Sequence, residues 1–388
     1  MVTACTNSPQ GTPSLPPGVS SQPAAEAVHS GSLRHPKVKE RVVYSFLGGS
    51  DGRDPLAELH YVKGKLFGTT LLGGTSDIGT VYRVTPTGME AVLHSFTGSP
   101  KDGSGPVAGL IGTTAFYTTT ADGGANNEGA VIKITSSGKE TVSYSFTGGS
   151  DGAAPAAALV SVGGTLFGTT SQGGGASRTG TVFSIAKSGT ERVLHSFGGA
   201  SDGIYPVAGL INVGGTLYGT TEFGGASGFG TVFSITRSGK EKIVYSFAGA
   251  PDGANPQAGL TNVGGTLYGT TEEGGKNGSG TVFRITTSGT EKVVHSFGSG
   301  SDGVSPFASL INVGGTLYGT TADGGTNGKG TVFSVTKSGK ESIIYNFAGG
   351  SDGATPTAAL INLSGTLYGT TGDGGGPNNY GTVFSIVL

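Results

Sequence analysis

Four aromatic residues and one glutamate have the types and positions expected of a carbohydrate-binding surface. Tyr205, Glu222, Phe223 and Phe229 belong to loops around one stretch of the sequence, and Tyr380 repeats the position of Phe229 near the C-terminal end. Sugar rings stack on aromatic faces, and neighbouring glycines and small polar groups leave room for hydrogen bonds to sugar hydroxyls. We therefore name these five residues as candidate ligand-binding residues.

Acidic residues are scattered over the same class of loop, and two of them could serve as the acid and base of glycoside hydrolysis. They are Asp77, Asp122, Glu128, Glu222, Glu272, Glu273, Asp323 and Asp373. The alternative stays open that these acids are solvated loop residues and that the aromatic residues only pin the loops. A G-x-S-x-G pattern recurs as well, but it falls between two strand-like runs, whereas a nucleophile elbow needs a strand, a turn and a helix. We assign no catalytic residue.

A third group of chemical interest is the aspartate of a recurring DGxxP motif. Asp can hydrogen-bond to its local backbone and Gly can take a positive φ, so the motif is typical of a locked loop. The alternative is one carboxylate per repeat that binds Ca²⁺ or sugar hydroxyls; no other cofactor or metal is predicted. The seven residues are Asp51, Asp102, Asp151, Asp202, Asp252, Asp302 and Asp352.

Three histidines alternate with tyrosines at one position of the repeat. His94, His195 and His295 take the place that other copies give to Tyr44, Tyr144, Tyr245 and Tyr345. Because they fall on the outermost strand of separate repeats, we expect them to pack as amphipathic rings and not to converge on a metal ion.

The elements that position these residues follow from a repeat of about 50 residues, which indicates a solenoid, a propeller or an array. Each copy contains four short runs rich in Val, Ile, Thr, Tyr and Phe; in one copy they are 207–213, 216–221, 230–236 and 242–247. Glycine-containing turns join the first run to the second and the third to the fourth, as in β-hairpins. Seven such copies predict an all-β, seven-bladed β-propeller of four-stranded antiparallel blades.

The two ends of the repeat region predict how the ring closes. The chain enters with an unpaired fourth strand at 41–46 and ends at Leu388 after a third strand, so the N-terminal strand completes the last blade. The predicted blades are 55–96, 106–146, 155–197, 206–247, 256–297, 306–347, and 356–388 with 40–46. The copy at 106–146 has IGTTAFYTTT where others have INVGGTLYGTT, which leaves its first hairpin in doubt.

Strand direction divides the loops between the two faces of the ring. The tight turns lie on one face and the long, variable loops, with the candidate ligand-binding residues, on the other. A glutamate that follows the second tight turn in every copy is predicted to be solvated strand-edge charge on the tight-turn face. These glutamates are Glu40, Glu90, Glu140, Glu191, Glu241, Glu291 and Glu341.

Residues 1–38 precede the predicted propeller at 39–388 and are rich in Pro, Ser, Gly and Ala, as in a disordered leader or tether. Cys5 follows Val-Thr-Ala in a pattern similar to a bacterial lipobox, which predicts lipidation of Cys5 and a membrane link through this lipid alone. The chain has a formal net charge of −2 with 12% charged residues. No basic surface is therefore expected for nucleic acid.

The motifs GTVF, SGxE, YSF, SDGxxP and GTLYGTT recur in order over about 40–388. Together they resemble the Gloeo/Verruco (GloVer) tandem repeat of choice-of-anchor type bacterial surface proteins. The resemblance implies an exported protein, extracellular or at the cell surface, and brings no catalytic residue. The leading expectation is a binding or scaffold propeller whose partner is a polysaccharide or another surface protein. Alternatives are a hydrolase or lyase with acidic residues at the central opening, and a purely structural repeat protein.

Overall fold

The structure, a computed structural model, describes residues 39–199, 201–298 and 301–388. Val38–Leu388 forms one compact unit, which is described below. The predicted leader 1–38 and the lipidation site predicted at Cys5 lie outside the described residues. In the part of the chain that the structure describes, no helix has the length and hydropathy of a membrane span.

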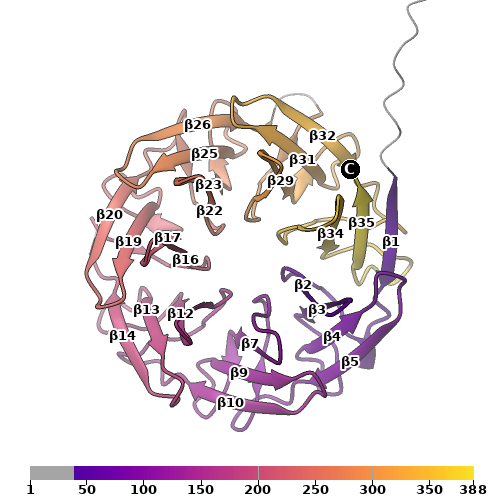
Figure 1. Ribbon diagram of the computed structural model, residues 1–388, viewed down its shortest axis with the longest axis horizontal. Helices are drawn as coiled ribbons and strands as arrows, with labels where there is room; N and C mark the ends of the chain where they lie inside the picture. The colour runs from indigo at the N-terminus through magenta and orange to yellow at the C-terminus, as the bar shows by residue number, and fades with distance from the viewer. Residues whose placement is uncertain (1–38, 200, 299–300) are drawn as a thin grey trace, which may run out of the picture. The chain divides into compact units, whose positions relative to one another are not determined.

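Seven small antiparallel sheets form a ring, which confirms the predicted seven-bladed β-propeller (Figure 1). In each blade the first strand lies next to the central opening and the last strand runs along the outer rim. Blade 1 consists of β2 (His60–Val62), β3 (Lys65–Thr70), β4 (Thr80–Val84) and β5 (Glu90–Ser95); blade 2 of β7 (Ala115–Thr120), β9 (Ala130–Thr135) and β10 (Glu140–Ser145); blade 3 of β11 (Val160–Val162), β12 (Thr165–Thr170), β13 (Thr181–Ile185) and β14 (Glu191–Ser196); blade 4 of β16 (Ile211–Val213), β17 (Thr216–Thr221), β19 (Thr231–Thr236) and β20 (Glu241–Ser246).

The remaining blades repeat this order, and the DGxxP loops add short two-residue strands on the long-loop face. Blade 5 consists of β22 (Thr261–Val263), β23 (Thr266–Thr271), β25 (Thr281–Thr286) and β26 (Glu291–Ser296); blade 6 of β28 (Ile311–Val313), β29 (Thr316–Thr321), β31 (Thr331–Thr336) and β32 (Glu341–Asn346); blade 7 of β33 (Ile361–Leu363), β34 (Thr366–Thr371), β35 (Thr382–Val387) and β1 (Glu40–Ser45). The short pairs are β6 (Gly103–Ser104) with β8 (Asp122–Gly123), β15 (Gly203–Ile204) with β18 (Phe223–Gly224), β21 (Gly253–Ala254) with β24 (Glu273–Gly274), and β27 (Gly303–Val304) with β30 (Asp323–Gly324); the 3-10 helix η1 spans Gly49–Asp51.

The ring closes as the ends of the sequence predict. Strand β1 pairs antiparallel with β35, and Val42 lies opposite Phe384. The first described strand is therefore the outermost strand of the last blade.

Blade 2 departs from the others at the hairpin that the sequence left in doubt. Its sheet has three strands, and the expected first strand is reduced to a single bridge between Ile111 and Tyr117. Five residues separate Ile111 from its partner Tyr117, whereas six separate Ile211 from Tyr218 in blade 4, so the three-pair first hairpin of that blade does not form here.

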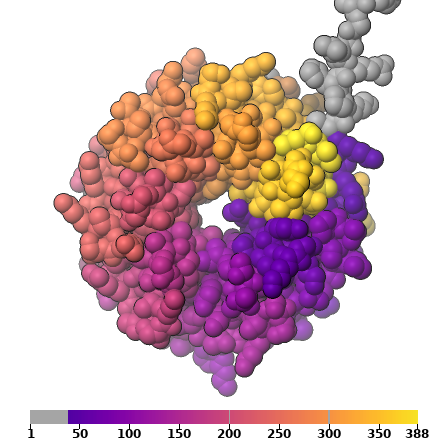
Figure 2. Space-filling view, in the orientation of Figure 1, coloured from indigo at the N-terminus to yellow at the C-terminus, as the bar shows by residue number. Residues whose placement is uncertain are grey.

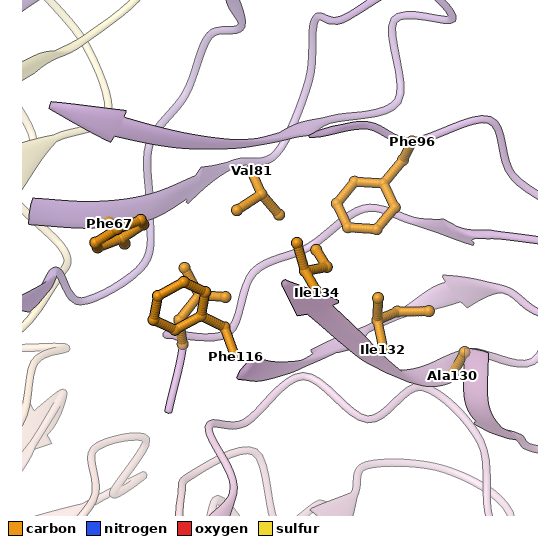
Figure 3. Packing of buried hydrophobic residues seen from close by; sticks show 8 residues of the cluster. Phe67, Val81, Phe96, Phe116, Ala130, Ile132 and Ile134 are labelled. Carbon is orange, nitrogen blue, oxygen red and sulfur yellow. The ribbon is translucent and has the colours of Figure 1, made fainter. Parts of the chain in front are cut away.

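The hydrophobic core lies between neighbouring blades. Figure 3 shows one such layer, in which Phe67 and Val81 of blade 1 face Phe116 and Ile134 of blade 2. The aromatic rings of successive blades meet edge to face, as between Phe247 and Phe283, whose centroids are 5.0 Å apart. Burial of large apolar side chains between blades supplies the main driving force for the ring.

A second, polar ring of contacts explains why the repeat retains its Gly-Thr-Thr motif. The first threonine hydroxyl donates to an alanine carbonyl of the next blade, as from Thr220 Oγ1 to Ala258 O at 3.0 Å. All seven junctions contain this bond, and the last runs from Thr370 Oγ1 to Ala57 O at 3.4 Å. Each blade is thus hydrogen-bonded to the next around the central channel.

Candidate ligand-binding site

A central channel passes through the ring and is lined by the segment that follows each DGxxP proline (Figure 2). The cavity at its centre measures about 360 Å³. Most of the lining side chains are small or apolar, because the first strands of the seven blades approach each other here. Gln257 and Glu58 are exceptions, and each lies at a position where other copies carry different residues.

Gln257 joins two carboxylates at the long-loop end of the channel. Its side-chain nitrogen donates to Glu222 Oε1 at 3.3 Å and to Glu272 Oε2 at 2.5 Å. The two accepting oxygens therefore lie no further apart than the sum of these distances. Glu222 and Glu272 each follow the Gly-Thr-Thr strand of adjacent blades, 4 and 5, which brings them to the same edge of the opening.

Burial raises the pKa of both glutamates in this cluster. For Glu222 the largest cause is loss of water, and the charge of Glu272 adds to it. For Glu272 the loss of water is again the largest cause, followed by the charge of Glu273, while the Gln257 hydrogen bond lowers the pKa. The mouth of the channel thus holds two carboxyl groups that offer several hydrogen-bond acceptors.

Two of the predicted aromatic residues lie beside this carboxyl pair. The rings of Tyr205 and Phe223 meet edge to face with centroids 6.1 Å apart, and Glu222 N donates to Tyr205 O at 3.0 Å. Tyr205 has a positive φ of 56° and is 37% exposed, so its ring is available to a ligand. The backbone of Glu222 thus connects the Tyr205–Phe223 pair to the carboxylates that Gln257 bridges. We call Tyr205, Glu222, Phe223, Gln257 and Glu272 the mouth cluster.

The other two predicted aromatic residues lie elsewhere. Phe229 is 41% exposed, and its ring packs over Gly249, in the loop that leads to blade 5. Tyr380 packs over Gly48 in the same way, and the Arg53 guanidinium lies 5.9 Å from the centre of its ring. Both rings cover the backbone of an interblade loop, so neither joins the mouth cluster.

The sequence reasoning missed Gln257 and Glu58. Glu58 lines the channel at a position where other copies have Gly, Ala or Ser. A comparison of the seven copies at each channel-lining position would have identified both residues. Of the scattered loop acids, Asp77 pairs with Arg53 and Asp373 accepts from Thr355, so these two have partners outside the cluster.

The seven DGxxP aspartates have one shared geometry. Each carboxylate accepts a hydrogen bond from the tyrosine or histidine of the preceding outer strand, as from Tyr245 Oη to Asp252 at 2.9 Å and from His195 Nε2 to Asp202 at 3.1 Å. Most also accept from nearby backbone N–H groups of their own loop. These bonds attach each interblade loop to the outer strand, and they explain why either tyrosine or histidine can occupy this position.

The repeated glutamates differ from the sequence prediction of solvated strand-edge charge. Each is half-buried at the junction with the preceding blade, beside the loop aspartate, and its Oε1 atom is buried without a hydrogen-bond partner among the described residues. The outer strands run along the rim toward the neighbouring blade, which carries their first residue into the junction (Figure 1). The prediction was wrong because it assumed that the outer strand runs from face to face.

This placement predicts that the propeller becomes less stable as the pH rises from about 5 to 8. At the tyrosine junctions, burial first and the loop aspartate second raise the pKa of Glu40, Glu90, Glu191 and Glu291 from 4.5 to about 7. Between these values the folded chain binds more protons than the unfolded chain, so the free energy of unfolding falls with pH. Thermal unfolding should show a Tm a few degrees lower at pH 8 than at pH 5.

A variant with Gln at these four positions provides the control for the pH dependence, because glutamine cannot ionise. We expect its Tm to vary less between pH 5 and pH 8 and to exceed that of the unaltered chain at pH 8. An equally steep pH dependence in the variant would contradict the assignment.

A second cavity, of about 710 Å³, lies between blades 2 and 3, next to the shortened hairpin. Ile111, Tyr117, Leu159 and Ile185 contribute apolar walls, and Lys133 lies with its Nζ atom 5.9 Å from the centre of the Tyr117 ring. The departure of this copy from the repeat therefore changes the surface as well as the hairpin.

Comparison of the sequence with known proteins identifies a family, and comparison of the structure with solved structures identifies the fold. The model of the Gloeobacter/Verrucomicrobia repeat matches residues 32–226, 91–272 and 211–388. No curated protein matches the sequence.

Several solved structures share the architecture. The lectin BP39L from Burkholderia pseudomallei matches with a TM-score of 0.55 at 12% identity, over 87% of this chain and 94% of the lectin. A puromycin-hydrolysing peptidase from Mycobacterium tuberculosis matches with a TM-score of 0.53 at 12% identity, over 88% of this chain but only 53% of the peptidase. The gluconolactonase XC5397 from Xanthomonas campestris matches with a TM-score of 0.44 at 12% identity, over 90% of each chain. At such identities the first two matches show the propeller fold alone.

Proposed function

We propose, on the premise that this chain belongs to the Gloeobacter/Verrucomicrobia repeat family, that it is an exported cell-surface propeller that binds carbohydrate at the mouth cluster. The observation that carries the proposal is the exposed ring of Tyr205, which packs against half-buried Phe223, next along the chain from Glu222, one of two carboxylates bridged by Gln257. Attachment to the surface through a lipid on Cys5, as in choice-of-anchor type proteins, is part of the same proposal.

The chemistry of the mouth cluster suits a neutral or hydroxyl-rich sugar. The exposed ring of Tyr205 offers a face for stacking, and the carboxylates of Glu222 and Glu272 accept hydrogen bonds from hydroxyl groups. Because Gln257 already holds both carboxylates in place, little side-chain freedom would be lost when a ligand binds. The cluster carries negative charge, which disfavours acidic polysaccharides.

The first test compares two aromatic residues that have similar exposure and different surroundings. We expect Tyr205→Ala to weaken binding about tenfold, as measured on a glycan array and by pull-down on cellulose, chitin and xylan, because it removes the stacking face. The replacement is one that the fold accepts, since blade 3 has Ala154 at the same position.

The matched control is Phe229→Thr, which copies Thr179 of blade 3 and alters only the ring over Gly249. It should bind like the unaltered chain. Loss of binding in both variants, or in neither, would count against the mouth cluster as the site, as would failure to bind any of the saccharides.

Glycoside hydrolysis is a second candidate function, favoured by one observation. The carboxyl oxygens of Glu222 and Glu272 both reach the same amide nitrogen, and retaining glycosidases hold their two carboxyl groups about 5–5.5 Å apart. If the site hydrolyses sugars, a polysaccharide bound in the pull-down will release reducing ends, and Glu222→Gln will stop the release. Binding without release would leave the binding function alone.

A further inference from the structure

Two of the three histidine junctions bring a third metal-binding side chain within reach. His195 meets Asp202 of the following loop and Glu241 of blade 4, and His295 meets Asp302 and Glu341 in the same way. In each group, one ligand atom from every residue lies within 4.8 Å of the other two. Each triad joins two adjacent blades on the outer rim, because Glu241 and Glu341 begin the outermost strands β20 and β32.

The chemistry of these triads suits a borderline metal ion. An imidazole nitrogen with two carboxylate oxygens supplies three ligands, and a water molecule can complete a four-coordinate site. The side chains of His195 and Asp202 are 23% and 21% exposed, which gives an ion access to the first triad. The second triad is less open, since His295 and Asp302 are 17% and 7% exposed. We propose that each triad binds one divalent transition-metal ion of the Zn²⁺ class.

A second observation concerns the glutamate of each triad. The Oε1 atoms of Glu241 and Glu341, like those of the repeated glutamates at the other junctions, are buried and have no hydrogen-bond partner among the described residues. At these two junctions an imidazole nitrogen and an aspartate oxygen lie within 4.8 Å of a carboxylate oxygen of that glutamate. A buried, unpartnered carboxylate oxygen costs free energy. A metal ion held by the neighbouring imidazole and aspartate would satisfy this oxygen, whereas the phenol at the tyrosine junctions is a poorer ligand because its hydroxyl must first lose a proton of high pKa.

The third histidine junction is different and serves as an internal comparison. Asp102 Oδ2 accepts from His94 at 2.9 Å and also from the backbone N and the hydroxyl of Thr97, at 2.9 and 3.2 Å. The corresponding residues at the other two junctions are Gly198 and Gly298, which have no hydroxyl. Asp102 is therefore occupied by protein donors, and we expect no tight site at His94.

The sequence predicts that the three histidines do not meet at one metal ion, and the structure places them in three separate junctions. Each lies in a different junction, but carboxylates from two further segments reach His195 and His295. The prediction considered the outer strands alone and placed the repeated glutamates on the tight-turn face.

The test uses the repeat itself as a source of substitutions that preserve the fold. We expect metal-stripped full-length chain, titrated with Zn²⁺ against a chromophoric chelator, to bind two ions more than the double variant His195→Tyr/His295→Tyr. This double variant copies the tyrosine junctions found at four of the seven positions. It also measures any background from Cys5 and the histidines of residues 1–38.

Further variants separate a metal site from a merely structural hydrogen bond. His195→Tyr alone and His295→Tyr alone should each remove one bound ion, whereas His94→Tyr should remove none. Tyr245→His should add one bound ion, beside Asp252 and Glu291. Zn²⁺ should also raise the Tm of the unaltered chain but not that of the double variant. Equal Zn²⁺ stoichiometry in the unaltered chain and the double variant would overturn the proposal, and so would an unchanged Tm.

Discussion

Replacement of Phe46 by Ala should destabilise the propeller by about 3–5 kcal/mol, the usual cost of removing a large buried aromatic side chain. Phe46 is 2% exposed and follows β1, the strand that closes the ring. Its ring meets that of Tyr82 in blade 1 edge to face at 5.0 Å, while its backbone N donates to Gly381 O in blade 7. One residue thus ties the first copy to the last.

The adjacent residue supplies the control. Leu47 is 67% exposed, so Leu47→Ala should change the free energy of unfolding very little. Chemical denaturation of both variants measures the difference. Similar stabilities for the Phe46 and Leu47 variants would mean that the seam contributes little to the ring.

The second large effect is expected at the glycine that precedes each third strand. Gly230 has a φ of +94°, and a Cβ atom there would lie 2.5 Å from Pro256 Cδ and 2.5 Å from Thr221 O. Gly230→Ala should cost about 2–5 kcal/mol, because backbone strain at positive φ adds to overpacking against the next blade. The measurement is again the free energy of unfolding.

Gly228, two residues earlier, separates the two causes of this cost. It has a φ of +83°, but a Cβ atom there would have no neighbour within 4 Å. Gly228→Ala should therefore cost only the backbone strain, about 1–2 kcal/mol. If the two alanine variants were equally stable, contact with Pro256 would not be what requires glycine at position 230.

The architecture could be read from the sequence because every copy repeats the same local signals. Alternation of apolar residues defined the strands, glycine-containing turns defined the hairpins, and the unpaired strand at 41–46 defined the closure that β1 and β35 form. The failure of the hairpin in blade 2 could also be anticipated, because its loop lacks the residues that the turn needs.

The site was less accessible to this reasoning, because side-chain direction depends on the path of the backbone. Tyr205, Glu222 and Phe223 lie close together because Tyr205 and Glu222 flank the short pair β15 and β18 and Phe223 belongs to β18. Phe229 was grouped with them by loop, yet the bend of that loop directs its ring to Gly249. Gln257 belongs to the next repeat along the chain, and the packing of blade 5 against blade 4 brings it to Glu222.

The repeated glutamates show the same limit on a larger scale. Their spacing correctly identified one glutamate per blade, but their burial depends on the direction of the outer strands along the rim. Strand twist rotates successive strands of a blade, and the rotation accumulates toward the outer edge. The twist angle cannot be read from the sequence pattern, so the repeated glutamates were predicted to lie on the surface although they lie at the junctions between blades.

The central claim is that residues shared by all copies build the ring, whereas residues that differ between copies build the ligand site. The most direct test is to give blade 4 the residues of blade 3, with Tyr205→Ala, Glu222→Ser and Phe223→Gln, which copy Ala154, Ser171 and Gln172. Isothermal titration with the saccharide identified for the unaltered chain, together with the Tm, measures both properties at once. An unchanged Tm with loss of saccharide binding is the predicted result; saccharide binding at the original affinity would contradict the account.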